Sequence, residues 1–222
     1  MRAIIPAKTS STRVPDKNWR PFHNQSSLVD LNIEALLGAG LAAADIHVSC
    51  EDAERLERLA RCWNVTPLLR DPALCPNDVP LTTWIRTICA QLPGDDDLIW
   101  SQVCDPLFAE HKTVIDKWPV SRAVGYDSLC VVYPLKAYLL DEQLHPIGWQ
   151  WGEWHTPSQD LPTLYTFPFT LSILTRDAIE RTGYHVGARP SWYVSRGDSL
   201  DIDTPADFET ARHTFAEKQN AR

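Results

Sequence analysis

Residues 1–18 read MRAIIPAKTSSTRVPDKN, an apolar run followed by a polar and basic stretch. Arg2 to Pro6 form a short apolar run that ends in proline, which predicts a buried strand that stops abruptly. The following loop supplies hydroxyl groups, backbone N–H groups and the positive charges of Lys8, Arg13 and Lys17. Such a strand-to-loop edge offers an anion many donors and would suit a triphosphate. A polar turn after an edge strand is the alternative.

The composition predicts a globular protein. The chain has 222 residues, of which 44% are hydrophobic and 23% charged, so it can bury a core. It lacks both a long apolar run and the apolar segment of a signal peptide, so we expect a cytoplasmic protein without membrane contact. The formal net charge of -8 argues against general nucleic-acid binding. The six cysteines show no metal-ligand spacing, which favours reduced thiols.

Strands and helices alternate along the first half of the chain. Apolar runs predict strands over 45–49, 65–69 and 98–103, and apolar periodicity predicts helices over 28–38, 52–63 and 82–92. This alternation predicts an α/β fold, a three-layer, doubly wound and mostly parallel sheet of the Rossmann-like type. We expect a single domain over residues 1–222. Ligands of such folds gather at the carboxyl ends of the strands.

Residues 134–168 differ in character, because they are rich in tryptophan and proline. Trp149, Trp151 and Trp154 lie close together in this stretch. One interpretation is an irregular excursion that buries its aromatic side chains against the main core. The other is an exposed apolar arm at an interface between subunits.

The second informative stretch is SLDIDTPADF, residues 199–208. In an extended segment, residues two positions apart face the same side, so Asp201 and Asp203 present both carboxylates to one point. Paired carboxylate oxygens suit Mg²⁺, which shares its coordination shell with substrate phosphates. Thr204 has the features of a helix N-cap, followed by Pro205 in the first turn. Acids of a solvated turn are the alternative.

Both ends of the chain resemble the acylneuraminate cytidylyltransferase family, whose members make CMP-sialic acid and related CMP-sugars, including 3-deoxy-manno-octulosonate. The opening is similar to the family's I-P-A-R-x-x-S-K-x-x-P-x-K-N motif, and the acidic stretch to its metal-binding signature. Lys8 replaces the family's arginine, and Thr12 replaces a lysine, although Arg13 could compensate for the lost charge. The opening matches at Pro6, Ala7, Ser11, Pro15, Lys17 and Asn18.

The resemblance extends to two loops between these ends. Arg70, in LLRDPALCPND, is similar to an arginine of the family's R-P-x-x-L-A-x-D segment, which implies a nucleotide contact; a surface arginine is the alternative. Gln102 to Leu107 resemble the family's Q-P-T-S-P-L loop, with Cys104 and Asp105 in place of Thr-Ser. Asp105 is either a third acidic group beside the metal and nucleotide or a turn residue.

The acceptor region is less similar. Gln159 and Tyr165 match the family's R-Q-x-L-P-x-x-Y segment, but Ser158 replaces its arginine, and Pro168 and Phe169 replace the following Asn-Gly. By resemblance, Gln102, Gln159 and Tyr165 are expected to bind the acceptor. The corresponding family segment packs on a second subunit, which implies a homodimer through residues 134–168.

The resemblance thus implies a Mg²⁺-dependent nucleotidyltransferase that transfers CMP from CTP to an acidic 2-keto sugar and releases pyrophosphate. A small phosphonate acceptor and a non-catalytic nucleotide-binding relative are the alternatives. The expected catalytic residues are Lys8, Lys17, Asp201 and Asp203, and the expected metal ligands are Asp201, Asp203 and Asp105. The expected nucleotide-binding residues are Pro6, Ala7, Lys8, Ser11, Arg13, Lys17, Asn18, Arg70, Gln102 and Asp105.

Overall fold

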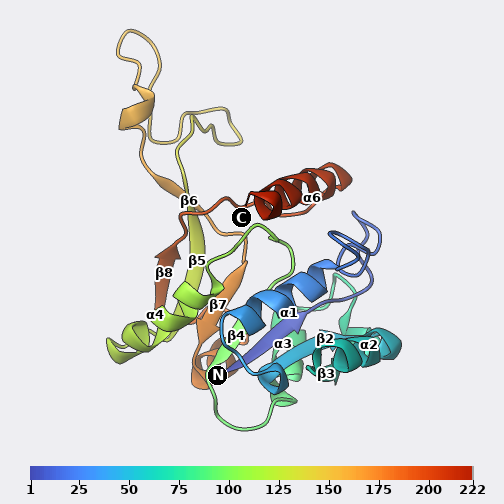
Figure 1. Ribbon diagram of the computed structural model, residues 1–222. Helices are drawn as coiled ribbons and strands as arrows, with labels where there is room; N and C mark the ends of the chain where they lie inside the picture. Colours follow the sequence, from blue (N-terminus) through green and yellow to red (C-terminus); the bar gives the residue numbers. More distant parts are fainter. Residues whose placement is uncertain (222) are drawn as a thin grey trace.

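The run that opens the chain forms a central strand of a mixed sheet (Figure 1). The computed structural model describes residues 1–221, which contain an eight-stranded sheet. Its order is β3-β2-β1-β4-β7-β5-β6, with β8 paired to β5. The strands are β1 (Arg2–Pro6), β2 (Ile46–Cys50), β3 (Thr66–Leu69), β4 (Leu98–Ser101), β5 (Ser128–Leu135), β6 (Leu164–Thr166), β7 (Leu171–Leu174) and β8 (Pro190–Val194).

The first four strands run parallel, with β1 between β2 and β4, so that Ala3 lies opposite both Ile46 and Ile99. The β8 strand is parallel to β5. In contrast, β7 lies antiparallel between β4 and β5, and β6 is antiparallel to β5. The predicted doubly wound, mostly parallel sheet is therefore confirmed, with two antiparallel strands that the sequence pattern did not indicate.

Helices cover both faces of the sheet. Successive side chains of β1 are apolar and point to opposite faces, so each face needs helices to bury it. Ala3 and Ile5 join the core beneath α1, α2, α4 and α6, whereas Ile4 joins the core beneath α3 and α5. Across residues 1–221, no helix combines the length and hydrophobicity needed to cross a membrane. The helices are α1 (Leu28–Gly38), α2 (Ala53–Trp63), α3 (Leu81–Ala90), α4 (His111–Ala123), α5 (Arg176–Thr182) and α6 (Pro205–Asn220).

The helix starts follow local capping chemistry. Ser27 and Thr204 each form a capping box with an aspartate three positions later, which confirms the predicted starts of α1 and α6. The other bounds shift by one to two residues. The expected strand over 45–49 is displaced because Asp45 ends a 3₁₀ turn, and the strand expected over 98–103 ends at Ser101. Gln102 is therefore released into the loop.

Residues 136–163 project from the body between β5 and β6 (Figure 1). The two strands pair in register from Tyr133 opposite Thr166 to Leu135 opposite Leu164, and so form the stalk of this projection. Trp149 is an internal anchor, because its Nε1 donates to the carbonyl of Leu139 at 2.8 Å. Trp151 and Trp154 remain 60% and 76% exposed, so they do not pack against the main core.

Candidate active site

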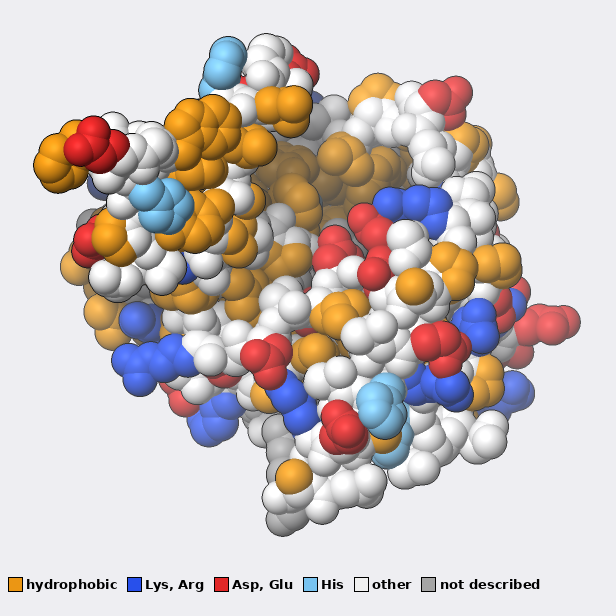
Figure 2. All heavy atoms as spheres, turned by 90° about the horizontal axis from the view of Figure 1, so that it is seen from above, with side chains coloured by type: hydrophobic (Ala, Val, Ile, Leu, Met, Phe, Trp, Pro, Cys, Tyr) orange, Lys and Arg blue, Asp and Glu red, His pale blue; other side chains and the backbone are white. Residues whose placement is uncertain are grey.

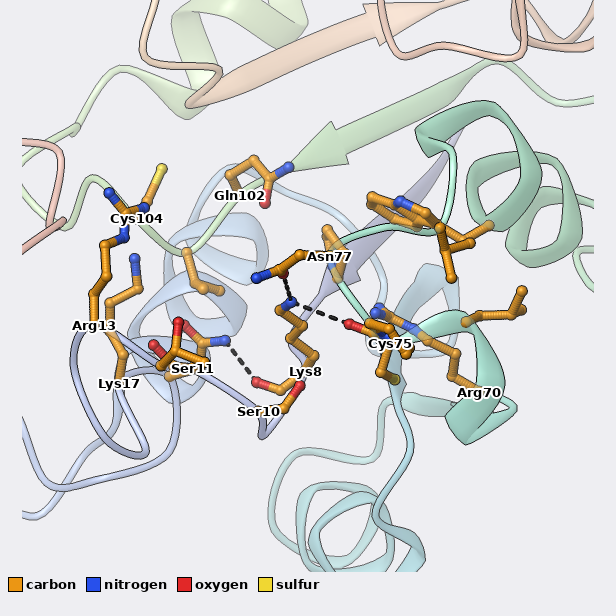
Figure 3. A pocket seen from close by; sticks show the side chains of 18 of the residues that line it. Lys8, Ser10, Ser11, Arg13, Lys17, Arg70, Cys75, Asn77, Gln102 and Cys104 are labelled. Atoms are coloured by element: carbon orange, nitrogen blue, oxygen red, sulfur yellow. Dashed lines mark hydrogen bonds between the residues drawn. The ribbon is translucent and has the colours of Figure 1, made fainter.

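A cavity of about 380 Å³ lies at the carboxyl ends of β1, β3 and β4 (Figure 3). Parallel strands bring their following loops to the same edge of the sheet, so three segments far apart in the sequence meet here. Of the predicted site residues, those that line the cavity are Pro6, Lys8, Ser11, Arg13, Lys17, Asn18, Arg70, Gln102 and Asp203. Ala7 and Asp201 do not line it, nor do Asp105, Gln159 and Tyr165.

The two lysines of the first loop are each held by a different partner. Lys8 Nζ donates to Asn77 Oδ1 at 2.7 Å and to the carbonyl of Cys75 at 3.1 Å (Figure 3). Lys17 Nζ donates to the carbonyl of Ile202 at 2.5 Å. These contacts gather positive charge around the cavity from one short loop.

Buried and partly buried hydrogen bonds stabilise the backbone of this loop. Asn18 Nδ2 donates to the carbonyl of Lys8 at 2.9 Å, and Trp19 Nε1 donates to that of Ala7 at 3.1 Å. Ala7 is fully buried beneath the loop, so it shapes the backbone rather than the cavity wall. Thr9 donates through its N–H and its hydroxyl to Glu51 after β2. The cationic side chains are thus presented by a supported backbone.

Asp201 and Asp203 stand on either side of the fully buried Ile202. The carboxylate of Asp203 pairs with the guanidinium of Arg13 at 2.6 Å and lines the cavity. Desolvation and then the charge of Asp203 raise the pKa of Asp201 above its usual range, although Lys17 and Cys104 act in the opposite direction. Of the predicted pair, only Asp203 therefore lies at the cavity wall, and a cation beside it would offset the charge of the carboxylates.

This donor set fits a cation that takes two protein carboxylates and completes its shell from phosphates and water, as Mg²⁺ does. Within residues 1–221, no group of three or more His, Cys, Asp or Glu side chains forms a metal site. The expected third acid, Asp105, does not line this cavity, because its carboxylate is turned to the segment before Asp201 and accepts hydrogen bonds from Ser199 and Leu200. It lines a second cavity, of about 360 Å³, beside α1, α6 and the start of α4.

Arg70 is buried rather than exposed, which excludes a simple surface arginine. Its Nε and Nη2 donate to the hydroxyl and the carbonyl of Ser49, and its guanidinium lies 5.3 Å from the ring centre of Trp84. Both Arg70 and Trp84 line the cavity. The sequence patterns assigned neither Trp84 nor Asn77 to the site; the position of Asn77 in a loop after a parallel strand was the available signal.

The predicted acceptor residues are divided between two places. Gln102 lines the cavity, as Figure 3 shows, and its backbone is held by Thr170 and Asn32. Gln159 lies in the projection, where its carbonyl accepts from Lys136, and Tyr165 lies on β6 and is 55% exposed. One chain alone does not bring these three residues together.

Structural comparison identifies the fold. The "CMP:2-keto-3-deoxy-manno-octonic acid synthetase complexed with CTP" superposes with a TM-score of 0.66 at 13% identity, over 98% of each chain. HddC from Yersinia pseudotuberculosis superposes with a TM-score of 0.59 at 14% identity, over 96% of this chain and 99% of that one. No family model and no curated protein sequence matches the chain. The protein therefore has an α/β nucleotidyltransferase-like fold.

Proposed function

We propose that the protein is a Mg²⁺-dependent cytidylyltransferase that transfers CMP from CTP to an acidic acceptor. The observation that carries the proposal is the meeting of the basic loop and the acidic segment at one cavity, through Lys17 at the Ile202 carbonyl and Arg13 at Asp203. A solved structure with the same fold is a complex with CTP, which supports this choice of nucleotide.

In the proposed reaction, an acceptor oxygen attacks the α-phosphorus of CTP and pyrophosphate leaves. Lys8, Arg13 and Lys17 would bind the phosphates, and the hydroxyl of Ser11 would add a donor at the same wall. Asp201 and Asp203 would hold Mg²⁺, which would neutralise phosphate charge and lower the pKa of a bound acceptor hydroxyl. Catalysis would then rest on positioning and charge stabilisation, so no separate histidine base is required.

We propose an acidic 2-keto sugar as the acceptor, with a small phosphonate as the alternative. Seen from above, the molecule is hollowed, with hydrophobic side chains inside the hollow and acidic side chains at its edge (Figure 2). Pro168 and Phe169 stand where the resembled family has Asn-Gly, and Phe169 is exposed and adopts a left-handed backbone with φ of 61°. This change favours an acceptor that needs fewer amide contacts than N-acetylneuraminate does.

The rest of the acceptor site would come from a second copy of the chain. Trp151 and Trp154 are exposed on the projection, and Gln159 and Tyr165 lie away from the cavity of their own chain. A homodimer that places the projection over the partner's cavity would cover these aromatic side chains and complete the site.

The deciding experiment measures pyrophosphate release with CTP, Mg²⁺ and a panel of 2-keto sugar acids and phosphonates. We expect release with CTP in preference to ATP, GTP and UTP, with N-acetylneuraminate as a poor acceptor. Efficient turnover of N-acetylneuraminate would contradict the altered acceptor site. CTP binding without release from any acceptor would favour the non-catalytic alternative, in which Lys8 stays engaged with Asn77.

A further inference from the structure

Asp105 is a buried carboxylate in the loop after β4, and only 6% of its surface is exposed. Within residues 1–221, no lysine, arginine or histidine forms an ion pair with it. A buried charge without a cationic partner is costly unless hydrogen bonds satisfy it. Asp105 therefore depends on the donors around it.

Those donors come from three separate parts of the fold. Oδ2 accepts from the hydroxyl of Tyr133 on β5 at 2.9 Å, from that of Thr170 before β7 at 3.1 Å and from that of Ser199 at 2.9 Å. Oδ1 accepts from the backbone N–H of Leu200 at 3.2 Å. Both carboxylate oxygens are thus engaged within the protein. The interaction with Asp105 raises the pKa of Tyr133, after burial as the larger cause.

The segment that Asp105 binds is the one that carries the acidic pair. The neighbouring residue, Cys104, accepts the N–H of Ile202 on its backbone carbonyl at 3.0 Å. Ser199, Leu200 and Ile202 are therefore all anchored to the dipeptide 104–105, and Asp201 lies between two anchored residues. On the other side, Arg13 and Lys17 hold the same segment at the cavity wall.

We propose that Asp105 is a positioning residue that fixes the segment 199–202, and through it the carboxylates of Asp201 and Asp203, before a metal or nucleotide binds. The inference rests on the proposed function for its catalytic consequence but not for its structural content. An aspartate suits this role because its four lone-pair directions accept several donors and it donates none. Serine, which the resembled family has at this position, offers a single oxygen and could not bind all four donors.

The same loop has a second, independent anchor that serves as a matched control. Glu110 accepts hydrogen bonds from the hydroxyls of Tyr193 and Ser195 and from the N–H groups of Arg196 and Gly197. This carboxylate holds the start of the loop, whereas Asp105 holds its middle. Loss of either acid should therefore loosen different amides.

The first test is amide hydrogen exchange on the protein without metal or nucleotide. In Asp105→Ala, exchange at Leu200 and Ile202 should accelerate about tenfold or more, because the segment loses its anchor, while exchange at Ile4 in β1 stays at the wild-type rate. In Glu110→Gln, acceleration should be confined to Arg196 and Gly197. Wild-type protection of Leu200 and Ile202 in Asp105→Ala would overturn the proposal.

If Asp105→Ala fails to fold, Ser199→Ala decides the question, because it removes one donor and leaves the carboxylate otherwise bonded. Faster exchange at Leu200 in this variant supports the proposal, and unchanged exchange overturns it. This arm needs no activity, so it remains decisive even if no acceptor is ever turned over and the proposed function fails.

A second test asks whether Asp105 and Ser199 act through the same contact. We expect Asp105→Ala to lower kcat and to raise the Mg²⁺ concentration for half-maximal pyrophosphate release, with metal-free CTP affinity unchanged. Because Ser199 would act only through Asp105, adding Ser199→Ala to Asp105→Ala should cause no further loss. Independent, additive losses from the two substitutions would contradict the positioning role.

Discussion

Lys17 is the residue that joins the two ends of the chain at the cavity. Its ammonium reaches the carbonyl of Ile202, 185 residues away in sequence, and it also lines the cavity. From this position the Lys17 ammonium can contact a phosphate in the cavity and also hold the acidic segment, through Ile202, at the cavity wall.

The first prediction is that Lys17→Ala weakens CTP binding by about 1.5–3 kcal/mol, because charge-assisted hydrogen bonds contribute that much. Isothermal titration calorimetry measures the loss. Lys112→Ala is the control, since Lys112 pairs with Asp116 on the exposed face of α4 and should leave CTP affinity unchanged. Equal affinity of Lys17→Ala and wild type would remove Lys17 from the site.

The second prediction concerns Asp203, which pairs with Arg13 at the cavity. Asp203→Asn keeps the shape and removes a charge, so the variant should fold and still bind CTP. It should lose turnover on the order of 10²-fold or more, because the Mg²⁺ ion that would offset the charge on the phosphates loses one of its carboxylate ligands. The pyrophosphate-release rate measures this effect.

Asp198→Asn is the matched control for Asp203→Asn, because Asp198 is an acid of the same loop that pairs with Lys218 and does not line the cavity. Its turnover should stay near that of the wild type. Full Mg²⁺-dependent activity in Asp203→Asn would contradict the metal assignment.

At the scale of elements, Asp30 links the first two helices. It completes the capping box of α1 with Ser27, and its carboxylate also accepts from Arg58 and from Trp63 Nε1 on α2. Burial acts to raise the pKa of Asp30, but the hydrogen bonds from Ser27, Arg58 and Trp63 together outweigh it and hold that pKa below its ordinary value.

The third prediction is that Asp30→Asn lowers the free energy of unfolding by about 2 kcal/mol at pH 7, the scale of lost charged hydrogen bonds. A depressed pKa adds stability that is fully present above the unfolded pKa and is lost as pH falls through the folded pKa. The difference between wild type and variant should therefore shrink as the pH falls below about 4. Urea unfolding at pH 7 and pH 3 measures it, and a constant difference would contradict this account.

At the scale of the whole molecule, the projection of residues 136–163 carries two exposed tryptophan side chains. The β5–β6 pairing holds the base of the projection in the sheet, and the hydrogen bond from Trp149 to the carbonyl of Leu139 stabilises its interior. Trp151 and Trp154 nevertheless remain exposed, and an apolar surface of this kind favours association.

The fourth prediction is that the protein is a homodimer at micromolar concentration, with the projection at the interface. Replacing both Trp151 and Trp154 by Ser should shift the sedimentation coefficient toward that of the monomer, because aromatic anchors contribute much of the binding energy. Tyr126→Ser, at an exposed aromatic residue after α4, should leave the dimer intact. A wild-type monomer would contradict the prediction.

The sequence by itself determined the features that depend on near neighbours. The first strand, its polar loop and the helix start at Thr204 all follow from contacts within a few residues. The α/β alternation followed for the same reason, because periodicity within one element reveals its buried face. The same local pattern drew attention to Lys8, Arg13 and Lys17, which line the cavity, whereas Arg70 and Gln102 were expected only from the resemblance.

Only the tertiary structure decided which distant residues meet. It inserted β7 antiparallel between β4 and β5, buried Arg70 against Ser49, and joined Lys8 to Asn77. It also surrounded Asp105 with donors from separate elements, where the sequence left a metal ligand and a turn residue as alternatives. The physical reason is that strand order and loop paths determine which distant groups become neighbours. An aspartate in the sequence therefore does not show whether its carboxylate will be bound by a cation or by a set of hydroxyl groups.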